Sequence, residues 1–238
     1  MTTRGAPAGT KYGETWVYES IIGALPGVDV SPGLALAIQF AVFEAAILFL
    51  AWVYGLWTAA IAGTVAVAVA TVGSAEMLRI GRRTREADIP EAYRRLLFGS
   101  NVEVVLSVLA YIALVTHLFV YDPQLGGEAL VTTLFGPEPP VLVVYLTLLV
   151  LWDVCYRIGT GWWASVVALW RSVRFRFDDE TRRQLMRADL ETLGFGLTQL
   201  ALVPFVLGQP VLLAAVVGHV LAVSAVTGLA ILLLRRQD

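Results

Sequence analysis

Three glutamates inside long apolar runs, Glu44, Glu103 and Glu191, are the residues that could do ion chemistry. An ionisable side chain within a membrane span is costly, and it usually marks a function or a buried pair. Glu44 is the sharpest case, because its own apolar run contains no lysine or arginine. A ring of carboxylates attracts cations or passes protons. Alternatively, each glutamate caps a helix or pairs with an arginine. We favour this structural role for Glu191, and a role in ion binding for Glu44.

Three further polar residues join this set of candidate transport or ion-site residues. Asp153 and Arg157 are four residues apart, so they share one helical face and lie within reach of each other. A neutralised pair of this kind costs less to bury than a lone charge, which favours a structural role, although a substrate-gating pair would have the same spacing. Asn101 is polar enough to hydrogen-bond between helices, and that is the commoner role of such residues.

The two histidines, His117 and His219, also fall within apolar runs. Two axial histidines on separate helices can hold a haem, but no C-x-x-C-H attachment motif is present. We prefer the explanation that the two histidines pack between helices and that the protein has no cofactor. Haem binding is the minor alternative. Cys155 is the single cysteine, which excludes an internal disulfide and a multi-cysteine metal site. We therefore predict no metal site and no catalytic residue.

Several familiar classes are excluded by missing residues. Lys11 is the only lysine, so the sequence lacks both a Schiff-base lysine in the last apolar run and a Walker A motif. The zinc-protease H-E-x-x-H and nucleophile-elbow G-x-S-x-G patterns are also missing. The P-x-[DE]-x-x-[KR] signature of mitochondrial carriers is absent as well, and no known family's motifs are matched. An enzyme is therefore the third hypothesis, and we lean against it.

The elements that would position these residues are membrane-spanning helices. The chain has 238 residues, of which 58% are hydrophobic and 15% charged, whereas soluble domains are about a quarter charged. A helix of about 20 residues crosses a hydrocarbon layer of about 30 Å. Six apolar runs meet this length, and they predict one all-α transmembrane domain over 31–238. The predicted spans are about 34–57, 58–78, 96–120, 141–163, 189–207 and 211–234.

The distribution of arginine predicts the orientation. Basic residues gather in 79–95, in 171–187 and near both chain ends, whereas the opposite connecting segments contain no lysine or arginine. The positive-inside rule then places both termini and these two loops in the cytoplasm of a multi-pass cell-membrane protein. Because the basic residues flank spans, we predict the lipid bilayer and not nucleic acid as the partner. A homo-oligomer or a membrane partner protein stays open.

Two segments depart from the simple pattern of spans. Residues 1–30 form an N-terminal tail without a secretory signal peptide, in which 15–28 suits either a short interfacial helix or an ordered polar tail. The fourth apolar run continues to Trp170, too far for one crossing. Its helix either projects into the cytoplasm or bends at Gly159 and Gly161 onto the membrane surface.

An internal repeat is predicted when the chain is shifted by 88 residues, which aligns 94–119 with 182–207. The alignment pairs Arg94-Arg95 with Arg182-Arg183, Asn101 with Asp189, and Glu103 with Glu191. Glu44 aligns more loosely with Glu103. These matches predict three helical hairpins related by an axis along the membrane normal. The alternative is that every helix leaving the cytoplasm begins with basic residues and an acidic first turn, which the helix dipole favours.

Two functions remain. The first is a small transporter or channel for a cation or a proton-coupled solute, with the three glutamates along a central path. The second is a non-transporting accessory, assembly or sensor protein whose buried charges hold helices together. The sequence favours the first slightly, because mid-span Glu44 has no evident partner.

Overall fold

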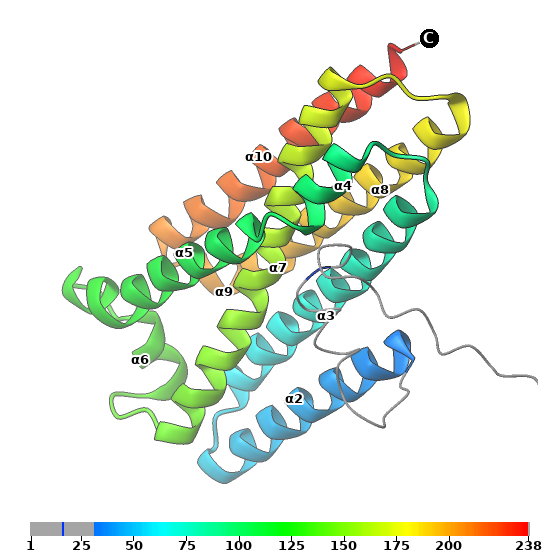
Figure 1. Cartoon of the computed structure of the whole chain (residues 1–238). Coiled ribbons are helices and arrows are strands. Elements are labelled where there is room, and N and C mark those ends of the chain that lie inside the picture. The colour runs from blue at the N-terminus through cyan, green and yellow to red at the C-terminus, as the bar shows by residue number, and fades with distance from the viewer. Residues whose placement is uncertain (1–15, 17–30, 238) are drawn as a thin grey trace, which may run out of the picture.

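The computed structural model describes Trp16 and residues 31–237, and this part of the chain is built from helices without strands (Figure 1). Its long helices lie side by side, with α7 in contact with α3, α5, α8 and α10. The six long helices are α2 (Pro32–Tyr54), α3 (Trp57–Glu86), α5 (Val102–Thr116), α7 (Val141–Arg174), α8 (Asp179–Thr198) and α10 (Pro210–Arg235).

Five stretches of the described chain are long and apolar enough to cross a membrane: α2, α3, α7, α10 and the run Glu91–Gln124. The prediction of an all-α fold is thereby confirmed, and the five stretches are compatible with a membrane protein. The fifth predicted span, 189–207, contains the end of α8, a 3-10 turn η3 (Gln199–Leu202) and the short helix α9 (Val203–Val206). This interrupted segment is not among the five, so the count of six spans stays a prediction.

The third predicted span is interrupted near its start. A short helix α4 (Glu91–Phe98) precedes α5, and the chain breaks between them at Asn101, whose φ is 54°. Asparagine is one of the few residues besides glycine that tolerate this left-handed conformation. The predicted arginine loop 79–95 is also largely helical, because α3 continues to Glu86.

Helix α7 is continuous over 34 residues, from Val141 to Arg174. At about 1.5 Å per residue it is roughly 50 Å long, which exceeds a hydrocarbon layer of about 30 Å. The helix is not interrupted at Gly159 and Gly161, and the choice between projection into the cytoplasm and a bend onto the membrane surface stays a prediction. Gly159 permits close contact with α5, because a Cβ atom there would clash with Ser107, whereas a Cβ atom on Gly161 would make only an ordinary contact with Phe195.

Helix α8 starts ten residues before the predicted fifth span, at Asp179. Its cap is Asp178, whose carboxylate accepts hydrogen bonds from the backbone N–H groups of Glu180 at 2.9 Å and Thr181 at 3.0 Å. The bonds from Thr181 and Glu180 favour the charged carboxylate and lower the pKa of Asp178. Capping therefore contributes stability at neutral pH and loses it as the pH falls through this lowered pKa.

The connection between α5 and α7 is also structured. It contains a π-helical turn η1 (His117–Tyr121), a 3-10 turn η2 (Asp122–Gln124) and the short helix α6 (Leu130–Phe135). The carboxylate of Asp122 accepts a hydrogen bond from the backbone N–H of Leu130 at 2.7 Å, which fixes the start of α6. This segment brings α6 beside α3 and η1.

The predicted interfacial helix over 15–28 lies outside the described residues, apart from Trp16. The Trp16 side chain is buried, and its ring centroid lies 4.9 Å from that of Phe98 in an edge-on contact. It belongs to the apolar core formed with residues of α3, α4, α7 and α8. A residue from the N-terminal tail thus packs inside the helical bundle.

The threefold repeat stays a prediction. Arg94 and Arg95 lie in α4, which the break at Asn101 separates from α5 and Glu103. In the matching segment, Arg182 and Arg183 share the uninterrupted helix α8 with Asp189 and Glu191. The two aligned segments therefore have different local structures.

Candidate functional site

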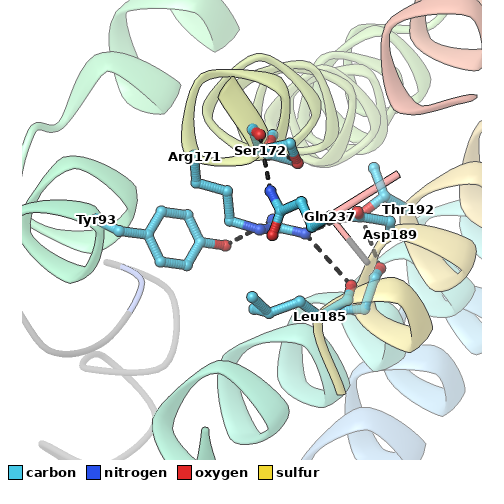
Figure 2. Close-up of polar contacts among 9 residues, drawn as sticks. Tyr93, Arg171, Ser172, Leu185, Asp189, Thr192 and Gln237 are labelled. Carbon is cyan, nitrogen blue, oxygen red and sulfur yellow. Dashed lines mark hydrogen bonds and ion pairs between the residues drawn. The ribbon is translucent and has the colours of Figure 1, made fainter. Parts of the chain in front are cut away.

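A buried ion pair joins the last turn of α7 to the middle of α8 (Figure 2). Arg171 donates to both carboxylate oxygens of Asp189, at 2.8 and 2.7 Å. The two side chains are only 1% and 3% exposed. Arg171 also donates to the hydroxyl oxygen of Tyr93 in α4 at 3.0 Å and to the carbonyl of Leu185 at 3.4 Å. Three helices are thus held around one guanidinium group.

The end of the chain is tied to the same region by Gln237. Its amide nitrogen donates to the carbonyl oxygens of Ser172 and Phe175, each at 3.0 Å. Its amide oxygen accepts from the backbone N–H of Phe177 at 3.3 Å. Because these carbonyls belong to the last turn of α7 and the residue after it, Gln237 satisfies groups that a helix end leaves free.

The ion pair predicted between Asp153 and Arg157 is present and extends to two further helices. Arg157 contacts Asp153 at 2.7 Å within α7, and its Nε donates to the hydroxyl oxygen of Ser74 in α3 at 2.6 Å. Gln39 in α2 donates to the second oxygen of Asp153 at 3.0 Å. The group therefore connects α2, α3 and α7. The Arg157 side chain is 1% exposed.

Glu191 has the arginine partner that was favoured for it. Its carboxylate accepts from Nε of Arg83 in α3 at 2.9 Å, and Nη2 of Arg83 lies 2.8 Å from the same oxygen. A neighbouring pair on α3 joins Glu76 to Arg79 at 2.7 Å. Glu191 therefore helps to hold α8 against α3.

Glu44 contacts a hydroxyl group. Thr64 in α3 donates to one carboxylate oxygen of Glu44 at 2.9 Å. The second oxygen is buried and has no hydrogen-bond partner among the described residues. The side chain thus faces the α2–α3 interface and leaves half of its carboxyl group unsatisfied.

Glu103 lies in the first turn of α5, fully buried, and neither carboxylate oxygen has a hydrogen-bond partner within the described chain. The neighbouring Ser107 donates to the backbone carbonyls of Glu103 and Tyr156, which joins α5 to α7. Asn101 is exposed and forms the break before α5, so its backbone positions Glu103. A carboxyl group in such surroundings is costly as an anion.

The three glutamates lie in three different interfaces: α2–α3, α5–α7 and α3–α8. Two cavities occur nearby. One is apolar and lies between α2, α3, α6 and α7, and the other is a small void beside Glu76 and Arg157. None of the three predicted path residues lines either cavity. Neither of these two cavities therefore connects the three glutamates.

The histidines occupy separate surroundings. His117 lies in η1 with its ring 5.8 Å from that of Tyr121, and His219 in α10 lies 6.2 Å from the ring of Trp162 in α7. Each has an aromatic packing neighbour. Within the part of the chain that the structure describes, no group of three or more His, Cys, Asp or Glu is placed to hold a metal ion.

Sequence reasoning missed the Arg171–Asp189 pair. Arg171 was assigned to a cytoplasmic loop and Asp189 to the first position of a span. One signal was present: the apolar run 166–170 leads directly into Arg171, which is typical of a helix that continues.

Replacing Glu44 with glutamine is expected to change the free energy of unfolding by less than about 1 kcal/mol. The amide oxygen still accepts the bond from Thr64, and a typical hydrogen bond contributes about 1 kcal/mol. Chemical denaturation in detergent measures this, with Thr64→Val as the variant that removes the donor. A loss of several kcal/mol in Glu44→Gln would show instead that the charge itself has a strong partner.

Comparison with known proteins gives a family but no activity. Residues 11–230 match a family of unknown function, DUF7530. No curated protein and no solved structure matches the chain.

Proposed function

Since this chain belongs to the DUF7530 family, whose function is unknown, we propose its role from the site: it is a non-transporting membrane protein of the accessory, assembly or sensor type. Its buried charges hold helices together. The observation that carries the proposal is the Arg171–Asp189 pair, which is almost completely shielded from solvent and joins α7 to α8.

The other strong polar contacts support the same role. The Arg157 group connects α2, α3 and α7, and the Arg83–Glu191 pair connects α3 to α8. A conduction site must let its ion enter and leave, whereas the side chains of Arg157 and Arg171 are each 1% exposed and held by specific partners. Paired charges of this kind fix the register of one helix against another.

Reconstitution into liposomes tests this proposal. Proteoliposomes loaded with a pH-sensitive dye, or with dyes for Na⁺ or K⁺, should show the same ion leak as protein-free liposomes. Proteoliposomes with the Glu103→Gln variant serve as the matched control. A wild-type flux above the protein-free level that the variant abolishes would overturn the non-transporting assignment.

A cation or proton-coupled transporter is the second candidate, and Glu103 is the observation that favours it. Its buried carboxyl group has no hydrogen-bond partner in the described chain, and such a group either takes a proton or faces an ion. In a transporter, Glu103→Gln removes flux while the protein stays folded. In the structural role, the same variant leaves stability unchanged or raises it, because glutamine removes the cost of a buried charge.

Both ends of the chain and the arginine-rich segments are proposed to lie on the cytoplasmic side of the cell membrane. Cys155 is the single cysteine of the sequence, so a Cys155→Ser background has no thiol other than the one introduced. In whole cells, an impermeant maleimide should label Gly127→Cys, in the connection without lysine or arginine, and should leave Asp179→Cys unlabelled. Asp179 is suitable because its side chain is 79% exposed. Labelling of Asp179→Cys alone would reverse the topology.

A further inference from the structure

An apolar cavity of about 150 Å³ lies between α2, α3, α6 and α7. Its walls include Ile47 of α2, Leu146 and Val150 of α7, and Phe135 of α6. Among the described residues, Thr147 is the only side chain with a polar atom on the walls, and its hydroxyl donates to the carbonyl of Val143 at 2.8 Å. The described walls therefore present no unsatisfied polar side chain.

The cavity follows from the sequence of α3. Four small residues face it at helical spacing: Ala59, Ala62, Gly63 and Ala66. Residues at i, i+3, i+4 and i+7 lie on one face of a helix, so α3 presents a shallow surface to the cavity. Larger side chains there would fill the space.

Two polar contacts lie beyond the lining residues, toward the N-terminal end of α2. Gln39 bonds to Asp153, which follows the lining residue Leu151 on α7 by half a turn. Glu44 bonds to Thr64 one turn before the lining residue Ile47 on α2. The other end of the cavity lies at the α2–α3 turn, where Leu56 lines it.

The surroundings indicate which molecule fills this space. A water molecule needs two to four polar partners, whereas an apolar cavity of about 150 Å³ stays dry and accepts a hydrocarbon. The walls come mainly from α2, α3 and α7, three helices long and apolar enough to cross a membrane. Trp52 and Trp57 are 70% and 55% exposed beside the α2–α3 turn, as expected of residues at the level of lipid headgroups.

We propose that this cavity is a binding site for the acyl chain of a membrane lipid whose headgroup lies near the α2–α3 turn. The acyl chain enters between α2, α6 and α7, and its end lies before the polar contacts of Glu44 and Asp153. This site is independent of whether the protein transports ions.

Photocrosslinking tests the site directly. The protein is reconstituted with a phospholipid that carries a diazirine at the end of one acyl chain, and crosslinks are mapped by mass spectrometry. Lining positions such as Ala62 and Val150 should be labelled, together with Leu221, which is 64% exposed on α10 and serves as an internal control for general lipid contact.

Ala62→Phe fills the cavity, and Ala215→Phe places the same side chain at an exposed position of α10. Labelling at Val150 should fall about tenfold in Ala62→Phe, the factor expected when roughly two methylenes lose their burial. It should be unchanged in Ala215→Phe, and Leu221 should be labelled equally in all proteins. If Ala62→Phe does not fold, Ala66→Leu fills the cavity with a smaller side chain.

Unchanged labelling at Val150 in a folded cavity-filled variant would overturn the proposal, as would wild-type labelling confined to Leu221. Competition with unlabelled lipids identifies the kind of molecule that occupies the cavity. Excess unlabelled phospholipid should reduce the crosslink at Val150; displacement by an isoprenoid alcohol alone would reject the lipid acyl chain as the occupant.

Discussion

Asp189→Asn is expected to lower the free energy of unfolding by about 3–5 kcal/mol, the loss typical when one partner of a buried ion pair is removed. The guanidinium of Arg171 would keep its place between α4, α7 and α8 but lose the opposite charge. Asparagine has nearly the same shape as aspartate, so the loss reports the charge and not a cavity. Thermal or denaturant unfolding in one detergent, followed by circular dichroism, measures the change.

Asp179→Asn is the matched control on the same helix. Asp179 pairs with Arg182 at 2.6 Å, but its side chain is 79% exposed. Exposed pairs contribute about 0–1 kcal/mol, so this variant should differ little from wild type. The double variant Arg171→Met/Asp189→Leu should regain most of the stability, because it removes both charges and keeps apolar volume. Equal losses in Asp189→Asn and Asp179→Asn would contradict the role assigned to the buried pair.

The local part of the site could be predicted from the sequence, and the long-range part could not. Asp153 and Arg157 were expected to meet because one helix brings residues four apart together, and they do. The partners of Glu44 and Glu191 are Thr64 and Arg83, which lie 20 and 108 residues away. Such contacts depend on how helices are rotated against each other, and apolar spans with nearly uniform hydrophobicity contain little information on rotation.

Hydrophobicity predicted where the long helices lie, but it predicted poorly where each helix begins and ends. The apolar composition of 96–120 concealed the break at Asn101, although Gly99, Ser100 and Asn101 are residues typical of a turn. The charged residues of 79–86 and 179–188 suggested loops, but both segments are helical. A helix that leaves the apolar layer can continue as a solvated helix, so a change from apolar to charged residues marks the membrane boundary and not the end of the helix. The Arg171–Asp189 pair was missed for this reason.

Gly159 of α7 lies tightly against the first turns of α5, in the interface that contains Glu103. A Cβ atom at this position would lie 2.3 Å from the hydroxyl oxygen of Ser107, 2.8 Å from its backbone nitrogen and 3.0 Å from the carbonyl oxygen of Glu103. Two of these three atoms belong to the backbone of α5, so a rotamer change cannot relieve the clash. Small residues permit this kind of approach between membrane helices.

Gly159→Ala is therefore expected to lower the free energy of unfolding by about 1–3 kcal/mol, the usual cost of overpacking a well-packed interior. Gly218→Ala on α10 is the control, because its added methyl group meets no atom within 4 Å, and alanine should stabilise a helix interior by about 0.5–1 kcal/mol relative to glycine. Adding Ser107→Ala to Gly159→Ala should restore only part of the loss, since the contact with the Ser107 backbone nitrogen remains. Unfolding measured in the same detergent decides between the outcomes. A Gly159→Ala variant as stable as Gly218→Ala would mean that α5 moves away from α7 without cost, and the burial of Glu103 would then not be a fixed feature of the fold.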